Sequence, residues 1–310
     1  MRIEYFDSID LSPYLLSARS PEGHRYPIRK YELLYEAILE AYPETSWSPF
    51  QFFEPSAVSA ETIKQTHCGD YTDDLVLGTL PAAKMRRIGF PWSERLIERT
   101  LTSTGGTMLT VEKAFEQGIA IHLSGGYHHA HFNYGSGFCL FNDLAVAAQH
   151  ALKKGADKVL IVDSDVHHGD GTASLMNDNP NIVTLSLHCD KNFPARKPNS
   201  DFDVPFSRGT KDKEFLEGFQ QVIQLALDLH QPDIVIFDAG VDIHQDDELG
   251  FLDVSLEGIR ARDSWMLSTC YQRGIPIACV IGGGYRSQHA DLVPIHYSLI
   301  EAAAQLKEVP

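Results

Sequence analysis

The chain has 310 residues, 43% of them hydrophobic and 22% charged, which is typical of a folded globular protein and excludes a largely disordered one. Its formal net charge of −16 at pH 7 argues against direct nucleic-acid binding, because contact with phosphates needs clustered Lys and Arg. No apolar stretch approaches the ~20 residues that span a bilayer, so we expect no membrane association.

Cysteine usage and the N-terminus indicate the compartment. The five cysteines are odd in number and form no CxxC pair, which argues against a disulfide framework and favours a reducing compartment. Residues 1–14 contain acids and no long apolar segment, so they do not resemble a signal peptide. We therefore expect a cytoplasmic protein. Its acidity would suit a cationic substrate, although solubility alone is the simpler explanation.

Apolar runs with strand character alternate with helical patterns over most of the chain. Residues 30–42 predict a helix, and we expect only helices and loops in the rest of the first hundred residues. Farther along, the pattern predicts strand 118–123, helix 143–155, strands 158–163 and 182–188, helix 211–230, strand 233–238, helix 256–274, strand 275–281 and helix 290–306. This order predicts a single α/β domain over residues 1–310, with a mostly parallel central sheet flanked by helices on both faces.

Each predicted strand ends in polar or glycine-rich residues. In open parallel sheets, ligands bind beyond the carboxyl ends of the strands. We therefore expect one site where five segments meet: 125–129, 163–170, 188–190, 238–244 and 282–285.

The run "VDSDVHHGDGT" indicates a metal site. Asp163, Asp165 and His167 are spaced two apart, so in extended chain they project to one side. Carboxylates this close repel unless a cation lies between them. Asp165 and His167, with Asp242 from a later strand end, offer three ligands and leave a position open, as in catalytic sites. This oxygen and nitrogen set suits Zn²⁺ and does not exclude Fe²⁺, Co²⁺ or Mn²⁺. Helix capping or arginine pairing would explain one of these aspartates but not the set.

His128 and His129 follow a strand and two glycines, which argues against a surface histidine pair. Each ring needs a partner to fix its tautomer, and Asp163 and Asp170 are available. A His–Asp pair beside a metal site is suited to act as general base and then as general acid.

Tyr285 follows three glycines, which allow a loop to approach a ligand closely. Its phenol could donate to a developing oxyanion, although a core tyrosine would fit the sequence equally well. Phe138 lies near the same edge and could form the wall of an apolar channel or belong to the core. The glycine run lacks the spacing of a nucleotide-binding loop.

Six motifs occur in order: GGYHHA, SGFCLFND, VDSDVHHGDGT, TLSLH, AGVDIHQDDELG and GGGY. Together they resemble the signature of the histone deacetylase superfamily, which has the arginase/deacetylase fold, over roughly residues 118–290. The short chain and segments such as FPARKPNSDFDVP are most similar to the class IV-like deacetylases and their bacterial relatives.

The resemblance implies a catalytic zinc ion bound by Asp165, His167 and Asp242. It also implies that His129, paired with Asp170, acts as general base and acid.

Further roles follow from the same resemblance. His128, paired with Asp163, would be an electrostatic partner, and Tyr285 would polarise the scissile carbonyl. Phe138 and the backbone of Gly137 would line a tunnel for an acyl-lysine side chain. A K⁺ ion near the zinc would be bound by Asp163, Asp165, His167, Ser186 and Leu187.

The predicted function is zinc-dependent removal of an acyl group from an N-acyl amine, most simply an acyl-lysine of a peptide or protein. One alternative substrate is an acetylpolyamine or another acylated small amine, whose positive charge the acidic run QDDELG could attract. Another is a long-chain acyl-lysine. A two-manganese ureohydrolase needs more ligands, and a catalytically silent acyl-lysine reader has no need of the His–Asp pairs.

Tyr127 and Ser164 depart from the family pattern. His168 is expected to make a structural hydrogen bond, and the second aromatic wall of the tunnel is not located. The sequence does not determine the oligomeric state.

Overall fold

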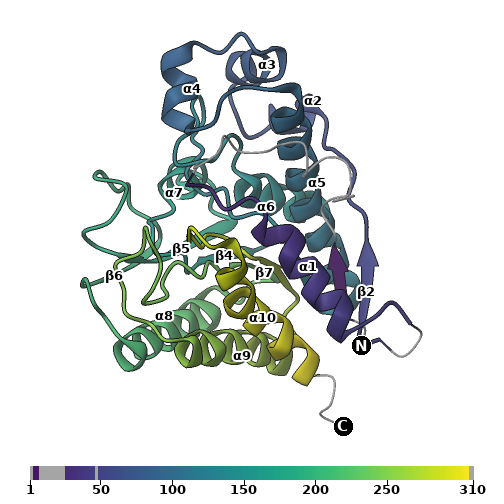
Figure 1. The fold of residues 1–310 in the computed structure, drawn as a ribbon, viewed down its shortest axis with the longest axis vertical. Coiled ribbons are helices and arrows are strands. Elements are labelled where there is room, and N and C mark those ends of the chain that lie inside the picture. Colours follow the sequence, from purple (N-terminus) through teal and green to yellow (C-terminus); the bar gives the residue numbers. More distant parts are fainter. Residues whose placement is uncertain (1–2, 7–24, 46–47, 307–310) are drawn as a thin grey trace.

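The computed structural model describes residues 3–6, 25–45 and 48–306. Within these ranges the protein forms an eight-stranded sheet in which every pair of neighbouring strands is parallel, in the order β2-β1-β3-β8-β7-β4-β5-β6 (Figure 1). The strands are β1 (Ile3–Phe6), β2 (Phe50–Phe53), β3 (Ile119–His122), β4 (Val159–Asp163), β5 (Ile182–Cys189), β6 (Phe202–Phe206), β7 (Ile234–Asp238) and β8 (Ile277–Val280).

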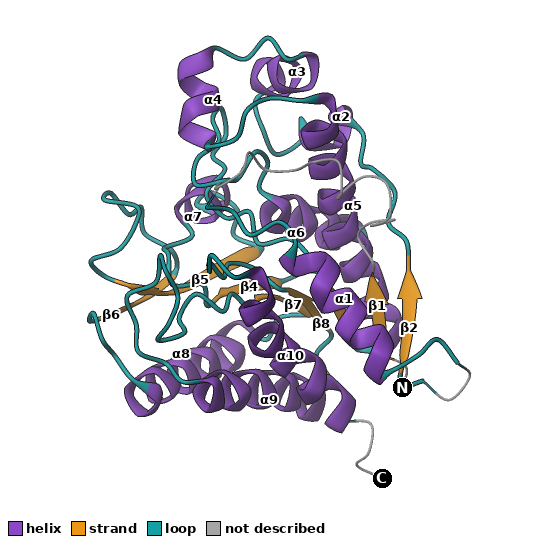
Figure 2. Ribbon diagram, viewed as in Figure 1, coloured by secondary structure: helices purple, strands orange, loops and turns teal. Residues whose placement is uncertain are grey.

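Helices cover both faces of this sheet (Figure 2). In β4, Leu160 and Val162 join the core cluster that contains α8, α9 and α10 residues, whereas Val159 and Ile161 join the cluster against α5 and α6. The helices are α1 (Lys30–Ala41), α2 (Ala60–Ile63), α3 (Gly69–Leu77), α4 (Ala82–Ile88), α5 (Glu94–Gln117), α6 (Asp143–Lys153), α7 (Asp170–Met176), α8 (Asp212–His230), α9 (Leu256–Arg273), the 3-10 helix η1 (His289–Leu292) and α10 (Val293–Gln305).

The predicted fold class is confirmed, and the central strands explain why the sequence revealed it. Every residue of β3, β4, β5, β7 and β8 is buried, which requires the continuous apolar runs seen in the sequence. Since one sheet takes strands from near both ends of the described chain, we propose that the whole chain is one domain. Among the described residues, no helix combines the length and the apolar character needed to cross a membrane.

Strands β1, β2 and β6 were not predicted. The expectation of only helices and loops before residue 100 is wrong at β1 and β2. Burial in β2 is partial, and the first four residues of β6, which include Pro205, alternate between partly buried and exposed positions. Edge strands of this kind lack the apolar run that identifies a buried strand. The prediction that there is no signal peptide rests on residues 1–14, which lie mostly outside the described ranges.

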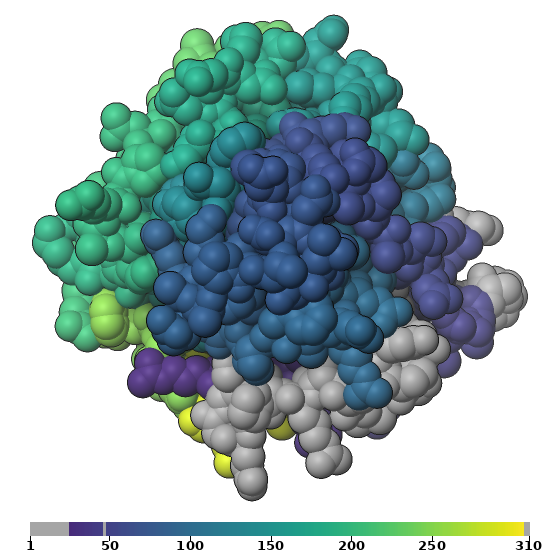
Figure 3. All heavy atoms as spheres, turned by 90° about the horizontal axis from the view of Figure 1, so that it is seen from above, coloured from purple at the N-terminus to yellow at the C-terminus, as the bar shows by residue number. Residues whose placement is uncertain are grey.

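The register of the central strands sets the position of the site. Asp163, the last residue of β4, lies level with Ser186 on β5 and with Asp238 on β7. The loops that follow β3, β4, β7 and β8 therefore leave the same edge of the sheet. Figure 3 views the molecule from above, and the segment carrying α2, α3 and α4 (blue) covers the middle of the face in view. This segment supplies one side of the pocket described next.

Candidate active site

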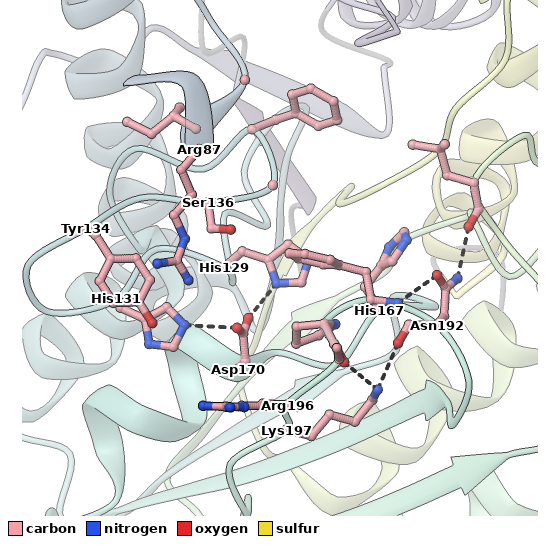
Figure 4. A pocket seen from close by; sticks show the side chains of 18 of the residues that line it. Arg87, His129, His131, Tyr134, Ser136, His167, Asp170, Asn192, Arg196 and Lys197 are labelled. Atoms are coloured by element: carbon pink, nitrogen blue, oxygen red, sulfur yellow. Dashed lines mark hydrogen bonds and ion pairs between the residues drawn. The ribbon is translucent and has the colours of Figure 1, made fainter. Parts of the chain in front are cut away.

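A pocket of about 1300 Å³ opens at the carboxyl edge of the sheet (Figure 4). Six residues predicted to form the site line it: His129, Gly137, Phe138, His167, Asp170 and Tyr285. They come from segments that are distant in sequence. Three of the five predicted segments, 125–129, 163–170 and 282–285, contribute to the lining, whereas 188–190 and 238–244 are not among the described lining residues.

The three predicted metal ligands lie together. Asp165, His167 and Asp242 are buried, and each offers one ligand atom within 4.8 Å of the other two. His167 Nδ1 lies 2.9 Å from Asp165 Oδ1 and 3.1 Å from Asp242 Oδ2. The backbone N–H of Gly283 donates to Asp165 Oδ2 at 3.0 Å, and that of Val166 donates to Asp242 Oδ1 at 2.7 Å. These bonds orient both carboxylates towards the ring.

The electrostatics of this group fit a cation. Burial and the charge of Asp165 raise the pKa of Asp242 to about 8. Burial alone would lower the pKa of His167, but its hydrogen bonds to both aspartates raise it to about 10. In the protein alone, protons therefore reduce the repulsion between the carboxylates, and a metal ion among the same atoms would do so more fully. A Cβ on Gly283 would collide with both aspartates, so the backbone approaches closely because this residue is glycine.

Two His–Asp pairs lie beside the predicted metal ligands. His128 Nδ1 is 2.7 Å from Asp163 Oδ2, and His129 Nδ1 is 2.6 Å from Asp170 Oδ1. The two Nε2 atoms are 3.1 Å apart. Burial and the nearby His128 charge lower the pKa of His129 to about 3. Burial would also lower the pKa of His128, but the charges of Asp163 and Asp165 raise it well above its usual value. One ring is thus neutral and its neighbour is cationic.

The segments carrying the predicted potassium ligands are adjacent. Asp163 and Ser186 are register partners on β4 and β5, and Leu187 follows on β5. The backbone N–H of Gly169 lies 3.5 Å from Ser186 Oγ. Potassium binding at this position stays a prediction.

The pocket has two aromatic walls. Phe138 lies 6.1 Å from Tyr285 between ring centroids and follows Gly137, where an added Cβ would lie 2.5 Å from Cδ2 of His129. The second wall, which the sequence did not locate, is Phe193: its ring centroid is 4.8 Å from that of His129, at an interplanar angle of 88°. Phe193 is 42% exposed, although it is a large apolar residue. Its place just after the end of β5 was the available signal.

The sequence did not identify Lys30 and Asp247 as contributors to the site, because each is far in sequence from the loop that it contacts. Lys30, on α1, donates from Nζ to the carbonyl oxygens of Gly282 at 2.9 Å and Gly284 at 3.4 Å, beneath the loop that carries Tyr285. The Tyr285 N–H donates to Asp247 Oδ2 at 2.6 Å. No local pattern links these residues, which are far apart in sequence.

His131 is a third histidine of the site that the sequence did not identify. Its Nε2 lies 2.9 Å from Asp170 Oδ2, so Asp170 contacts two imidazoles. Its position two residues after His129 was the available signal.

The residues that depart from the family pattern are structural. Ser164 Oγ donates to the Asp238 carbonyl oxygen at 2.9 Å and accepts from Arg262 at 3.1 Å. Tyr127 Oη lies 2.9 Å from Ser124 Oγ. His168 makes the kind of structural hydrogen bond that was expected, with Nε2 3.1 Å from an oxygen of Asp203.

Comparison with known proteins agrees with this geometry. A protein of Picosynechococcus described as uncharacterized is 43% identical over 286 residues, which are 92% of this chain and 94% of that protein. Acetoin utilization protein AcuC of Bacillus subtilis is 32% identical over 256 residues, covering 74% of this chain and 66% of that protein. Histone deacetylase 2 of Arabidopsis thaliana is 32% identical over 194 residues, covering 61% of this chain and half of that protein.

The fold and the family also agree. The crystal structure of the HDA15 HD domain superposes with a TM-score of 0.81 at 23% identity, covering 98% of this chain and 89% of that one. The family model described as histone deacetylase domain matches residues 24–296. With most of its length matched, the chain belongs to the histone deacetylase domain family.

Proposed function

We propose that this protein is a metal-dependent amidohydrolase that removes the acyl group from an N-acyl amine, with acyl-lysine side chains as its substrates. The observation that carries the proposal is the convergence, at the base of one pocket, of the Asp165–His167–Asp242 group, two His–Asp pairs and Tyr285. Family membership supports hydrolytic deacetylation and leaves the substrate open.

Asp165, His167 and Asp242 would hold the metal, and their oxygen and nitrogen atoms suit zinc. When bound, the ion would supply Lewis acidity and lower the pKa of a water molecule. Potassium bound near Asp163 and Ser186 would add positive charge behind the same group.

His129 is suited to move the protons. Its Nδ1 is held by Asp170, and its low pKa leaves the ring neutral at pH 7. Nε2 can therefore accept a proton from the attacking water and return it to the leaving amine. The adjacent cationic His128, paired with Asp163, would stabilise negative charge that develops near it.

Tyr285 is suited to donate to the developing oxyanion. Burial and the charges of Asp165 and Asp242 raise its pKa well above the usual value, so the phenol keeps its proton. Asp247 fixes the backbone of Tyr285, and Lys30 fixes the glycines before it. A donor held in place in this way costs little reorganisation when the charge forms.

The three carboxylates of the acidic run QDDELG all accept hydrogen bonds or pair with a cation inside the protein. Asp247 accepts backbone N–H groups from Tyr285, Leu249 and Gly250. Asp246 pairs with Arg286 at 3.1 Å, and Glu248 accepts from the backbone N–H and the hydroxyl of Ser287. An acetylpolyamine would have to compete with these contacts for the carboxylates.

The proposal is tested with two variants and a fluorogenic acetyl-lysine peptide. After loading with zinc, Tyr285→Phe and His129→Ala should each keep one zinc per chain, while turnover falls about 100-fold or more. Tyr134→Phe, which removes a hydroxyl from the same pocket, is the matched control and should retain turnover. Unchanged turnover in either variant would refute the role of that residue, and two transition metals per chain would favour the ureohydrolase alternative.

A further inference from the structure

The mouth of the pocket is basic, although the chain carries a net charge of −16. Four of the described residues that line the pocket are cations: Arg25, Arg87, Arg196 and Lys197. The acids among these described residues are Asp170 and Glu248. Asp170 is occupied by His129 and His131, and Glu248 by Ser287. The four cations therefore outnumber the two carboxylates among these described residues, so the entrance carries an excess of positive charge.

Arg87 is held in a way that leaves its donors available. Its guanidinium carbon lies 3.9 Å from the centre of the Tyr134 ring, and that ring stacks on His131 at 4.4 Å. Stacking uses the flat face of a guanidinium and leaves its in-plane N–H groups free. Those groups match the geometry of a carboxylate, which they can bind through two parallel hydrogen bonds.

Arg196 is presented by a fixed loop. The next residue, Lys197, donates from Nζ to the carbonyl oxygens of Asn192 at 2.8 Å and Pro194 at 2.7 Å. This contact folds the loop between β5 and β6 back on itself, and Arg196 is exposed on that loop. Within the described part of the chain, no carboxylate forms an ion pair with either Arg87 or Arg196.

Both arginines line the same pocket. In Figure 4, Arg87 lies above and Arg196 below the His131–Asp170 pair. They come from α4 and from the loop after β5, so the tertiary structure creates this arrangement.

We propose that the substrate is an N-acyl amine whose amine part carries a carboxylate, which Arg87 and Arg196 bind at the mouth of the pocket. This inference rests on the proposed hydrolase function and specifies its substrate class. A cationic carrier such as an acetylpolyamine would meet like charge at the entrance, whereas a carboxylate would be attracted locally despite the acidic surface elsewhere. The carboxylate could belong to an acidic peptide around the acyl-lysine or to a small amino acid.

The experiment compares substrates that differ only in charge. Acetyl-lysine peptides of equal length, flanked by aspartate, by glutamine or by lysine, are assayed with the zinc-loaded protein at low ionic strength. The kcat/KM should be about threefold to tenfold higher for the acidic than for the neutral peptide, and lowest for the basic one, with the differences shrinking in salt. Nε-acetyl-lysine with a free carboxylate and a blocked α-amine, assayed alongside, distinguishes a small substrate from a peptide.

Variants then locate the effect. Arg87→Gln combined with Arg196→Gln should reduce the ratio of acidic to neutral kcat/KM to near one. Arg86→Gln is the matched control: it removes the same charge one position away, from a residue that lines a neighbouring hollow. The control should keep both the ratio and the turnover of the wild type.

The outcomes separate the inference from the proposed function. Equal kcat/KM for acidic and neutral peptides, with both hydrolysed, would overturn the inference and leave the hydrolase intact. If no substrate is hydrolysed, the proposed function fails. Fluorescence anisotropy with the same peptides, carrying a neutral dye, then decides the inference: tighter binding of the acidic peptide supports it, and equal or weaker binding refutes it.

Discussion

Replacement of the buried Lys30 by methionine should separate stability from activity. Lys30 is 1% exposed and donates to two carbonyl oxygens in the loop before Tyr285. Burial lowers its pKa from 10.5 to about 8, although the charges of Asp242 and Asp165 oppose the change. The difference of about 2.5 pH units corresponds to about 3 kcal/mol at about 1.4 kcal/mol per unit.

The direction in which Lys30 changes the free energy of unfolding with pH follows from proton binding. Below pH 8 Lys30 is charged in both the folded and the unfolded chain, so the cost of burying its charge is fully present. Between pH 8 and 10.5 the unfolded chain binds more protons, so Lys30 makes the free energy of unfolding rise with pH. Methionine removes both this cost and its pH dependence, while the two carbonyl groups lose their donor at about 1–3 kcal/mol. The net change in stability at pH 7 should therefore be small.

Activity should respond differently. Without Lys30, the glycines that place Tyr285 lose a fixed contact, and a shift of about 1 Å in a reacting group can reduce turnover about 100-fold. Urea unfolding of the metal-free protein from pH 7 to 10 gives the stability curve, and kcat of the zinc-loaded protein gives the activity. Lys213→Met, at an exposed position, is the control. Stability curves of wild type and Lys30→Met that rise in parallel above pH 8, or an unchanged kcat, would refute the reasoning.

Three further substitutions test the site and its support. Phe193→Ala should raise KM for an acetyl-lysine peptide about tenfold, since it removes one apolar wall, and an unchanged KM would contradict that role. Gly283→Ala should weaken zinc binding at least tenfold in competition with a chelator, because its Cβ would displace Asp165 and Asp242. Zinc affinity equal to that of the wild type would show that the backbone moves to make room for the Cβ. Arg262→Met should lower the free energy of unfolding by about 3–5 kcal/mol, since it leaves the buried Asp263 carboxylate without its cation; a loss below 1 kcal/mol in urea unfolding would argue against it.

The sequence was informative wherever local pattern and chemistry coincide. The central strands are buried on both faces, so their apolar runs identified them and their polar ends located the site. The spacing of Asp165 and His167 predicted that their side chains would be neighbours, and the two side chains do lie together. Edge strands β2 and β6 were missed because partial burial leaves no such run.

By itself, the sequence determined the fold class, the order of the motifs and the residues that converge at the strand ends, because these depend on periodicity and on the edge that parallel strands share. The tertiary structure alone decided that Lys30 supports the loop before Tyr285, that Phe193 forms the second wall and that Arg87 and Arg196 share the mouth of the pocket. These contacts join segments with no pattern in common. Side-chain packing and strand register bring them together, and neither can be read from one stretch of chain.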